Sequence, residues 1–486
     1  MPEAIARLQP IEIWKNFAAL NAVPRPSKRE ERITAFMMAF GRSLGLETLS
    51  DPIGNVLIRK PASPGHENRQ GVVLQAHLDM VHQKNEATPF DFETQGIDMF
   101  LDGDWVRARG TTLGADNGLG VAAIMAVLQA RDLEHPPLEA LFTVDEETGM
   151  SGAKALSPDW LRGRILLNLD TEDDEELGVG CAGGVDVTGT GTYRPEALPA
   201  GWEGMRLRVN GLQGGHSGMD IHKGLANANK LLARLLYACA GQARFRVSRA
   251  SGGNLRNAIP REAEALLALD PATRDTIIEI IKTEQATILE EFAPVEPGIR
   301  ISLEAAERPS TGMPEAEQLS LLRCLCALPS GVAFMSYGFP GQTETSNNLA
   351  LFRVGDGQVH IGCLTRSSRE SRKEDLVRTL ESVLSLAGYA METGGAYPGW
   401  QPNADSGALA LLRGRYQALF GQTPHVVAGH GGLECGIIGA HYPDMDMISF
   451  GPTILGAHSP DERASVASCQ KFWRLLRDVL AHIPTV

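Results

Sequence analysis

Residues 72–79 of the chain read VVLQAHLD, an apolar run that ends in a histidine and an aspartate. Two later segments repeat this pattern: residues 138–147 read LEALFTVDEE and residues 164–170 read RILLNLD. Short apolar runs separated by helical patterns predict an α/β sheet domain. Open α/β sheets bind their ligands at the carboxyl ends of the strands. We therefore expect the polar residues that follow the three runs to converge on one site.

The composition is that of a large globular protein with an acidic surface. The chain has 486 residues, of which 43% are hydrophobic, and 45 basic against 59 acidic side chains give a net charge of −14. This length predicts two or three domains, and the negative charge argues against a nucleic-acid binder.

No apolar run approaches the roughly 20 residues of a membrane span, and residues 1–9 lack the features of a secretory signal. Seven scattered cysteines predict reduced thiols in a cytoplasmic protein.

Two glycine-rich segments mark breaks in the pattern. Residues 178–184 read GVGCAGG and would suit a domain crossing, and residues 394–399 read GGAYPG. We expect a catalytic domain of residues 1–182 and 397–486, interrupted by a lid domain of residues 183–396. Further strands are predicted at 185–192, 205–209 and 446–450, and further helices at 226–237, 274–291 and 465–482.

His77 and Asp79 are the first candidates for chemistry. A single histidine is more often a hydrogen-bonded structural residue than a metal ligand. Residues two apart at a strand end share a face, so Asp79 can accept the N–H of the ring nitrogen that does not bind metal. The pair therefore favours a metal site.

Carboxylates supply the other candidates, and each has a simpler interpretation. Asp116 lies in the segment GTTLGADNG (110–118), where it is either a helix N-cap or a ligand that bridges two cations. The acidic run at 145–147 is either a solvated turn or a pair of adjacent glutamates in which one binds metal and the other acts as general base. Asp170 is either a turn residue or a third ligand.

His458 lies in a predicted loop, GPTILGAHSPDE (451–462), and alone carries no more weight than any other histidine. Together with the residues above, it gives two histidines and three carboxylates. Three carboxylates offset three of the four positive charges of two divalent ions, and one hydroxide would offset the fourth. This charge balance is typical of a two-metal hydrolase.

Read in order, these motifs resemble the M20 family of metallopeptidases. The motifs that carry the resemblance span nearly the whole chain: HLD (77–79), GADNG (114–118), DEETG (145–149), Asp170, GGHSG (214–218) and AHSPDE (457–462). Within the family, VHQKN (81–85) and LNLDTE (167–172) are most similar to the bacterial aminoacyl-histidine dipeptidases. The resemblance implies a zinc-peptidase-like catalytic domain with a central mixed sheet flanked by helices, and an inserted α+β lid domain.

The resemblance also implies a role for each candidate. Asp116 would bridge two divalent ions, expected to be Zn²⁺, with Co²⁺ or Mn²⁺ as alternatives. His77 and Asp170 would complete one ion, and Glu147 and His458 the other. Glu146 would be the general base and Asp79 the residue that orients His77.

Four residues outside this set resemble the substrate-binding residues of the family. His216 would help to hold the oxyanion, and Asn257 and Arg366 would grip the terminal carboxylate of the substrate, for which a guanidinium fork is suited. Arg369 competes with Arg366 for that role. Gly432, in GGLECG (431–436), would lie in a loop that faces the substrate.

The resulting hypothesis is a metal-dependent dipeptidase that hydrolyses short peptides with a water activated by two metals. Xaa-His dipeptides, including β-Ala-His, are the expected substrates. One alternative is an amidohydrolase that acts on N-acyl amino acids, and another is a non-catalytic peptide-binding relative. The expected partner is a dipeptide, without nucleic acid or membrane, and a homodimer is an open alternative to a monomer.

Overall fold

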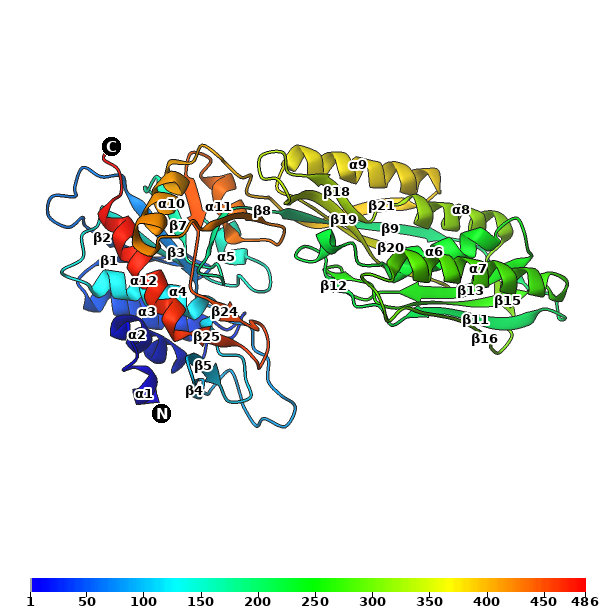
Figure 1. Ribbon diagram of the computed structural model, residues 1–486, viewed down its shortest axis with the longest axis horizontal. Coiled ribbons are helices and arrows are strands. Elements are labelled where there is room, and N and C mark those ends of the chain that lie inside the picture. Colours follow the sequence, from blue (N-terminus) through cyan, green and yellow to red (C-terminus); the bar gives the residue numbers. More distant parts are fainter. Residues whose placement is uncertain (1) are drawn as a thin grey trace. The chain divides into compact units, whose positions relative to one another are not determined.

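The computed structural model describes residues 2–486, so Met1 of the predicted N-terminal segment lies outside the described residues. The chain divides into two compact units, which are drawn in Figure 1. Unit 1 runs to Gly180 and resumes at residues 402–428 and 433–486. Unit 2 comprises residues 181–401 and 429–432.

Unit 1 is built on an eight-stranded mixed sheet in the order β1-β2-β6-β3-β7-β23-β8-β22. Strands β6, β3, β7 and β23 pair in parallel, whereas β1, β2 and β6 pair antiparallel and β8 pairs antiparallel with β23. The three strands predicted from the sequence are confirmed as β3, β6 and β7, and they are neighbours in the sheet. The strands are β1 (Glu47–Ser50), β2 (Val56–Lys60), β3 (Val72–His77), β6 (Leu138–Thr143), β7 (Ile165–Asn168), β8 (Glu176–Cys181), β22 (His425–Gly429) and β23 (Asp446–Ser449).

Helices flank this sheet, as an α/β fold requires (Figure 1). Helix α4 is buried along nearly its whole length and packs against β3 and α2, because its residues are almost all small or apolar. A four-stranded sheet in the order β24-β25-β5-β4 completes unit 1. Its strands are β4 (Met99–Asp102), β5 (Trp105–Ala108), β24 (Ile454–Leu455) and β25 (Arg463–Ser465). The helices are α1 (Pro2–Ile5), α2 (Ile11–Asn21), α3 (Glu31–Ser43), α4 (Ala115–Gln129), α5 (Ser151–Lys154), α10 (Gly407–Phe420), α11 (Glu434–His441) and α12 (Val466–Ala481).

Unit 2 is built on an antiparallel sheet in the order β16-β11-β15-β13-β19-β20-β9-β21, with β18 paired to β19. The strands are β9 (Gly183–Thr192), β11 (Glu203–Asn210), β13 (Phe245–Gly252), β15 (Ala263–Leu269), β16 (Arg300–Ala305), β18 (Gly331–Met335), β19 (Thr343–Gly355), β20 (Gln358–Ser367) and β21 (Ala390–Tyr397). Two short ladders join β10 (Glu196–Ala197) to β17 (Thr311–Gly312) and β12 (Gly215–His216) to β14 (Ala258–Ile259).

Four helices lie along one face of this sheet (Figure 1). They are α6 (Ala228–Cys239), α7 (Arg274–Phe292), α8 (Glu315–Ala327) and α9 (Glu370–Leu386), with 3₁₀ turns η1 (Ile221–Lys223) and η2 (Pro271–Thr273) between them. Their leucines and isoleucines form one hydrophobic core with the strands. The sheet with helices on one face is the α+β arrangement that the sequence predicted for this part of the chain.

The glycine-rich segments differ from their prediction. Residues 394–397 still belong to β21, where Gly394 pairs with Asp186 and Tyr397 with Gly184, so the break predicted near 394–399 begins only after Tyr397. Most of 178–184 likewise lies in β8 and β9. Glycine lowers strand propensity but does not prevent pairing when neighbouring strands enforce it. No disulfide bond links the cysteines of residues 2–486, and no helix in that range is long and apolar enough to cross a bilayer.

Candidate metal centre and substrate-binding residues

The polar residues of unit 1 meet because their strands are neighbours. His77 ends β3, the acidic run 145–147 follows β6, and Asp170 follows β7. These strands are parallel, so their carboxyl ends lie at one edge of the sheet. Asp116 reaches the same place from the start of α4, where its backbone is not helical (φ −80°, ψ 112°).

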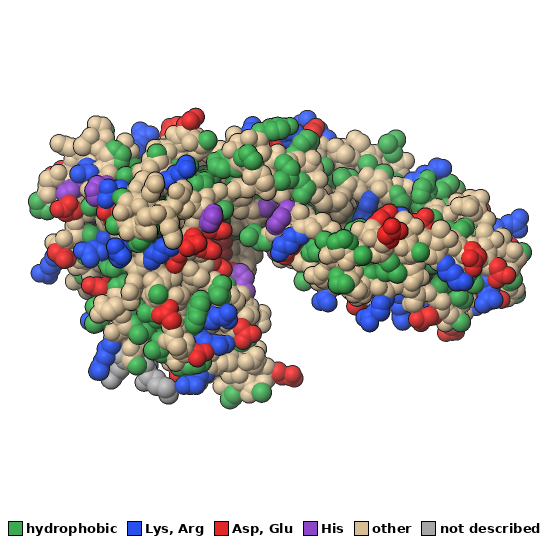
Figure 2. Space-filling view, viewed as in Figure 1, with side chains coloured by type: hydrophobic (Ala, Val, Ile, Leu, Met, Phe, Trp, Pro, Cys, Tyr) green, Lys and Arg blue, Asp and Glu red, His purple; other side chains and the backbone are tan. Residues whose placement is uncertain are grey.

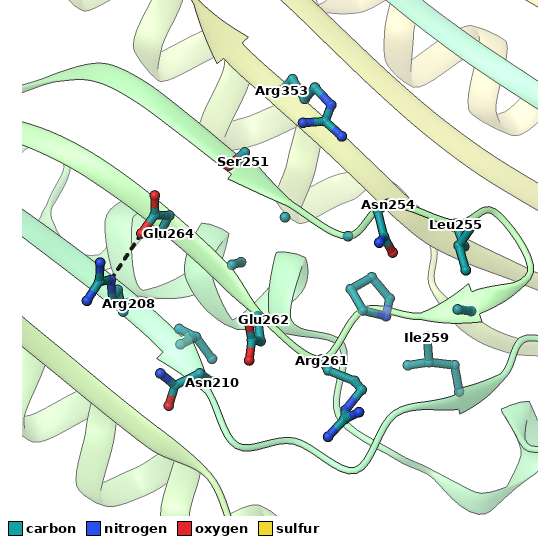
Figure 3. A pocket seen from close by; sticks show the side chains of 16 residues that line it. Arg208, Asn210, Ser251, Asn254, Leu255, Ile259, Arg261, Glu262, Glu264 and Arg353 are labelled. Atoms are coloured by element: carbon teal, nitrogen blue, oxygen red, sulfur yellow. Dashed lines mark hydrogen bonds and ion pairs between the residues drawn. The ribbon is translucent and has the colours of Figure 1, made fainter. Parts of the chain in front are cut away.

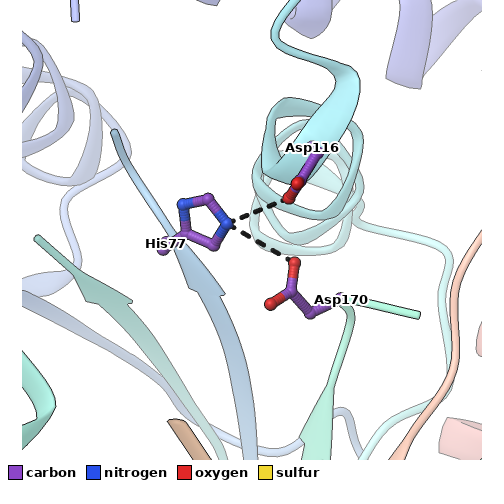
Figure 4. A group of neighbouring side chains, drawn as sticks. All are labelled: His77, Asp116 and Asp170. Atoms are coloured by element: carbon purple, nitrogen blue, oxygen red, sulfur yellow. Dashed lines mark hydrogen bonds and ion pairs between the residues drawn. The ribbon is translucent and has the colours of Figure 1, made fainter. Parts of the chain in front are cut away.

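His77, Asp116 and Asp170 form a first group (Figure 4). The Nε2 atom of His77 lies 3.1 Å from Oδ1 of Asp116 and 3.5 Å from Oδ1 of Asp170. All three side chains are largely buried and come from three separate segments. One nitrogen and two carboxylate oxygens within reach of a single point are a donor set suited to zinc.

Asp116, Glu147 and His458 form a second group. The Nε2 atom of His458 lies 3.1 Å from Oδ2 of Asp116 and 3.0 Å from Oε2 of Glu147. Asp116 therefore belongs to both groups, with one oxygen facing each histidine. His458 adopts a left-handed backbone conformation (φ 63°), which is uncommon for a residue other than glycine and is found preferentially at functional sites.

Asp79 connects His77 with the two glutamates. Nδ1 of His77 lies 3.3 Å from Oδ1 of Asp79 and 3.2 Å from the backbone carbonyl oxygen of the same residue. The same carboxylate accepts the backbone N–H groups of Glu146 at 3.0 Å and Glu147 at 3.3 Å, and the hydroxyl of Ser27 at 2.8 Å. The carboxylate of Glu146 forms a third group with His77 and Glu147. Asp79 thus fixes the ring of one histidine and the turn that carries both glutamates.

We name Asp116, Glu147 and Asp170 the acid cluster. Its carboxylates raise the pKa of His77 and His458, and Arg25 acts on Asp116 and Glu147 without forming an ion pair with them. Burial raises the pKa of Asp170 to about 7 and that of Glu172 to about 8, with the negative charge of Asp116 adding to both shifts. The Oε1 atom of Glu147 is buried without a hydrogen-bond partner. Within residues 2–486 no lysine or arginine forms an ion pair with Asp116, Glu147 or Asp170. Buried carboxylates need such compensation, so the residues present fit divalent cations.

Figure 2 shows a group of acidic side chains beside a histidine on the visible face of unit 1, and elsewhere on both units acidic and basic side chains are interspersed.

The N-cap interpretation of Asp116 is wrong, because another carboxylate serves the start of α4. Glu462 accepts the backbone N–H groups of Leu113 (2.6 Å), Gly114 (3.0 Å), Ala115 (2.7 Å) and Asp116 (3.3 Å). The side chain of Asp116 is thereby left to face the histidines. Sequence reasoning included Glu462 in a motif but gave it no role, since Leu113 and Glu462 are 349 residues apart.

Arg25 was not predicted at all. Its buried guanidinium donates to the backbone carbonyls of Leu78 (3.1 Å), Asp79 (3.2 Å) and Gly114 (2.6 Å). It therefore joins the segment that carries His77 to the segment that carries Asp116. Burial lowers its pKa to about 10, so it remains charged at neutral pH. Nothing in the local sequence around Arg25 indicates this role.

The predicted substrate-binding residues lie together in unit 2. The side chain of Arg366, only 4% exposed, donates from Nη1 to the Tyr397 hydroxyl (2.8 Å) and from Nε to the Ser217 hydroxyl (3.3 Å). The backbone N–H of Ser217 donates to the carbonyl of Asn257 (2.7 Å). We name Arg366, Tyr397 and Ser217 the arginine cluster.

His216 precedes Ser217 and has a defined tautomer. Its Nδ1 accepts the backbone N–H groups of Gly218 at 3.2 Å and Met219 at 3.1 Å. A ring nitrogen that accepts hydrogen bonds carries no proton, so Nε2 of the neutral ring is the donor. Gly432 belongs to unit 2 through the short segment 429–432, in which His430 contacts Ser346 (2.8 Å).

Arg369, the competitor of Arg366, has a different environment. Its side chain is 45% exposed, and its Nε lies 3.6 Å from Oε2 of Glu344. An exposed guanidinium beside a carboxylate is already neutralised, whereas Arg366 forms no ion pair within residues 2–486; Asp186, the acid that acts on it at longer range, is paired with Arg256 at 3.5 Å. This contrast favours Arg366 as the residue that meets an anion.

Unit 2 also contains a cavity of about 650 Å³ on its sheet. Figure 3 shows Arg208, Glu262, Glu264, Arg261 and Arg353 around it, with an ion pair between Arg208 and Glu264 (3.0 Å). None of the four predicted substrate-binding residues lines this cavity. Its charges are mixed, and it is separate from the arginine cluster.

The geometry agrees with the comparison to known proteins. A model described as peptidase family M20/M25/M40 matches residues 73–482. The chain belongs to this family. The resemblance noted from the sequence is therefore confirmed, as are the fold class and the assignment to the metallopeptidases. Peptidases of the family are dinuclear metal enzymes, in line with the two groups that share Asp116.

Two similar proteins match over nearly their full length. The cytosol non-specific dipeptidase of Escherichia coli (strain K12) is 44% identical over 480 residues, which cover 99% of each chain. The crystal structure of aminoacylhistidine dipeptidase from Vibrio alginolyticus superposes with a TM-score of 0.93 at 43% identity, covering 99% of this M20 chain and 98% of that one. The aminopeptidase PepT from Bacillus cereus, at 16% identity and a TM-score of 0.57 over 98% and 99% of the two chains, shares the fold.

Proposed function

We propose that this M20 peptidase is a dipeptidase that requires two divalent ions. The observation that carries the proposal is the position of Asp116, whose two carboxylate oxygens each lie 3.1 Å from a different histidine. A carboxylate placed in this way can bind two cations at once, and the remaining ligands divide into one set for each. His77 and Asp170 would hold the first ion, and Glu147 and His458 the second.

We further propose that both ions are Zn²⁺, with Co²⁺ or Mn²⁺ as substitutes. Nitrogen and carboxylate ligands in small groups are typical of zinc. When bound, such ions lower the pKa of a water molecule toward 7 and polarise a carbonyl group.

Glu146 is the general base in this proposal. Its carboxylate lies with those of the ligands, but its neighbour Glu147 is the one that faces His458. The hydrogen bond from its backbone N–H to Asp79 holds it in place. Glu146 accepts a proton from the attacking water and then donates it to the amine that leaves. Asp79 keeps the Nδ1 proton of His77 in position.

The residues of unit 2 bind the dipeptide. Arg366 and Asn257 hold the terminal carboxylate, and Gly432 permits close approach of the substrate backbone. The tautomer of His216 supports its role, because Nε2–H can donate to the oxygen that becomes negative during attack. A buried arginine that must meet a free carboxylate restricts hydrolysis to very short peptides.

The names of the relatives suggest the substrates. One relative is a non-specific dipeptidase and the other an aminoacylhistidine dipeptidase. We propose that the chain hydrolyses Xaa-His dipeptides, β-Ala-His among them, within a wider set of dipeptides. The cytosol named for the E. coli relative supports a cytoplasmic location.

A rate survey tests the proposal directly. The purified chain, supplied in turn with Zn²⁺, Co²⁺ and Mn²⁺, is assayed on β-Ala-His, Ala-His and Ala-Ala and on an N-acetyl amino acid. Hydrolysis of the dipeptides, with much weaker hydrolysis of the N-acetyl compound, is the expected result. Preference for the N-acetyl compound would indicate the amidohydrolase, and no hydrolysis with any metal would indicate a binding protein.

A further inference from the structure

We infer that Tyr397 is a positioning residue for Arg366, and that Gly184 allows it to act by leaving open the space that the tyrosine ring crosses. This inference rests on the proposed role of Arg366 in binding the substrate carboxylate. It adds a specificity-determining contact that the sequence did not indicate.

The strand register places the three residues in one row. Gly184 of β9 pairs with Arg366 of β20 on one side and with Tyr397 of β21 on the other. Residues directly opposite each other in antiparallel strands project from the same face. Arg366 and Tyr397 are therefore two strands apart, a distance of about 9.6 Å between backbones. Their side chains can meet only by crossing the middle strand.

Glycine at position 184 makes this crossing possible. A Cβ atom on Gly184 would lie 2.7 Å from Cε1, Cζ and the hydroxyl oxygen of Tyr397. Such distances are well below van der Waals contact, so any side chain would displace the ring. The ring thus lies over the bare backbone of Gly184 and brings its hydroxyl to 2.8 Å from Nη1 of Arg366.

A hydroxyl is a suitable partner for an arginine that must bind an anion. A carboxylate in the same place would neutralise the guanidinium, as Glu344 does for Arg369 and Arg372. Burial raises the pKa of the Tyr397 phenol, so the group stays neutral and accepts a hydrogen bond without cancelling the positive charge. Tyr397 and Ser217 therefore fix the orientation of the Arg366 guanidinium without neutralising its positive charge, so that it can bind a carboxylate.

A second glycine on β9, Gly191, and Tyr389, which directly precedes β21, supply a matched control. A Cβ atom on Gly191 of β9 would lie 2.3 Å from Cδ1 of Tyr389, so this pair has a similar packing relation. Gly191 pairs with Val359, seven residues before Arg366 on β20. Substitutions at Gly191 and Tyr389 therefore test packing without touching the arginine cluster.

The experiment compares Y397F with Y389F, and G184A with G191A, in the full chain with metal. The probes are Ala-Ala as substrate and its C-terminal amide as a competing ligand. We expect Y397F to raise KM for Ala-Ala about 5- to 10-fold, since a hydrogen bond to a charged group is lost. Its kcat and the inhibition constant of the amide should stay within about 2-fold of the wild type. G184A should act in the same direction, and both control variants should match the wild type.

Three results separate the inference from the function on which it rests. An unchanged KM in both Y397F and G184A, with a raised KM in R366A, would overturn the inference alone. An equal rise for Ala-Ala and for the amide would also overturn it, because the effect would not depend on the carboxylate. An unchanged KM in R366A would overturn the proposed role of Arg366 as well. If Y397F does not fold, G184A decides the question by the same criteria.

Discussion

The acid cluster of unit 1 and the arginine cluster of unit 2 both bury charge, but of opposite sign. In the acid cluster, Asp116, Glu147 and Asp170 have two histidines as partners and no lysine or arginine in residues 2–486. In the arginine cluster, Arg366 donates to two hydroxyl groups and forms no ion pair with a carboxylate in the same range, and Asp186 acts on it only at longer range. Neither cluster forms an ion pair between a lysine or arginine and a carboxylate, although the acid cluster raises the pKa of both of its histidines.

This difference indicates what each cluster binds. A buried charge without an opposite charge is costly unless a ligand supplies one. The acid cluster therefore requires cations, and the arginine cluster requires an anion such as a terminal carboxylate. By contrast, the buried Glu139 is paired internally with Arg59 at 2.9 Å.

Removal of divalent ions should have the largest effect, because it deprives the acid cluster of its missing charge. We expect dialysis against a chelator to reduce dipeptide hydrolysis by about 10³-fold or more. Added Zn²⁺, Co²⁺ or Mn²⁺ should restore it, and bound metal measured by atomic emission should approach two ions per chain. Full activity in a chain shown to be free of metal would contradict the inference that the acid cluster requires cations.

Substitution of the general base should be the next largest effect. We expect E146Q to lower kcat about 10²- to 10⁴-fold, because the amide cannot accept a proton from water. Its metal content should remain that of the wild type, since Glu146 is not a ligand in the proposal. Metal analysis of the same preparation distinguishes lost chemistry from lost ions. Normal turnover would remove Glu146 from this role.

Loss of the guanidinium should weaken substrate binding rather than chemistry. We expect R366A to lower kcat/KM for a dipeptide about 10- to 100-fold, mainly through KM, since charge-assisted hydrogen bonds to the carboxylate are lost. R369A is the matched control and should change kcat/KM by less than about 2-fold, because Arg369 is exposed beside Glu344. The reverse order of effects would assign the role to Arg369.

The smallest expected effect concerns the stability of the protein and depends on the buried side chain of Glu434. Glu434 accepts hydrogen bonds from Gln75 and Thr143, both at 2.6 Å, and burial raises its pKa to about 8. Its Oε1 has no hydrogen-bond partner. His77, Asp170 and Asp79 are the charged groups that face it. Unlike the arginine cluster, this site keeps its charge low by holding the acid protonated.

The sign of the pH effect follows from the raised pKa. Between the unfolded pKa of 4.5 and the folded value of about 8, the unfolded chain binds fewer protons, so stability falls as pH rises. In metal-free wild-type protein, the free energy of unfolding should fall by an amount on the order of 1 to 3 kcal/mol from pH 5 to pH 7 because of Glu434. The E434Q variant should lack this fall. Urea unfolding of both chains at the two pH values measures the difference. An identical pH dependence of the two would show that Glu434 ionises freely in the folded chain.

The central part of the fold follows directly from local patterns. The apolar strands β3, β6 and β7 are short, continuous and followed by charged residues, and their positions agree with the prediction to within a residue or two. Strand β21 was not predicted, because the glycines and the proline of 394–399 indicate a break, whereas pairing with β9 holds residues 394–397 extended. Pairing within the sheet there outweighs the low strand propensity of glycine.

The groups that gather around Asp116 were all named from the sequence, because each is a histidine or carboxylate at the end of a strand or in a motif. The residues that support them could not be named in the same way. Arg25 acts on backbone carbonyls and Glu462 on backbone N–H groups. Such contacts leave no side-chain pattern, and their partners lie far away in the chain.

The long-range bonds of Glu462 also have a consequence for biosynthesis. The amides of 113–116 emerge early from the ribosome, but the carboxylate that fixes them, and His458 beside it, follow only after the whole of unit 2 has been made. A nascent chain can therefore form strands β3, β6 and β7 and still lack a finished centre. The full set of residues around Asp116 is therefore present only after residue 462 has been added to the chain.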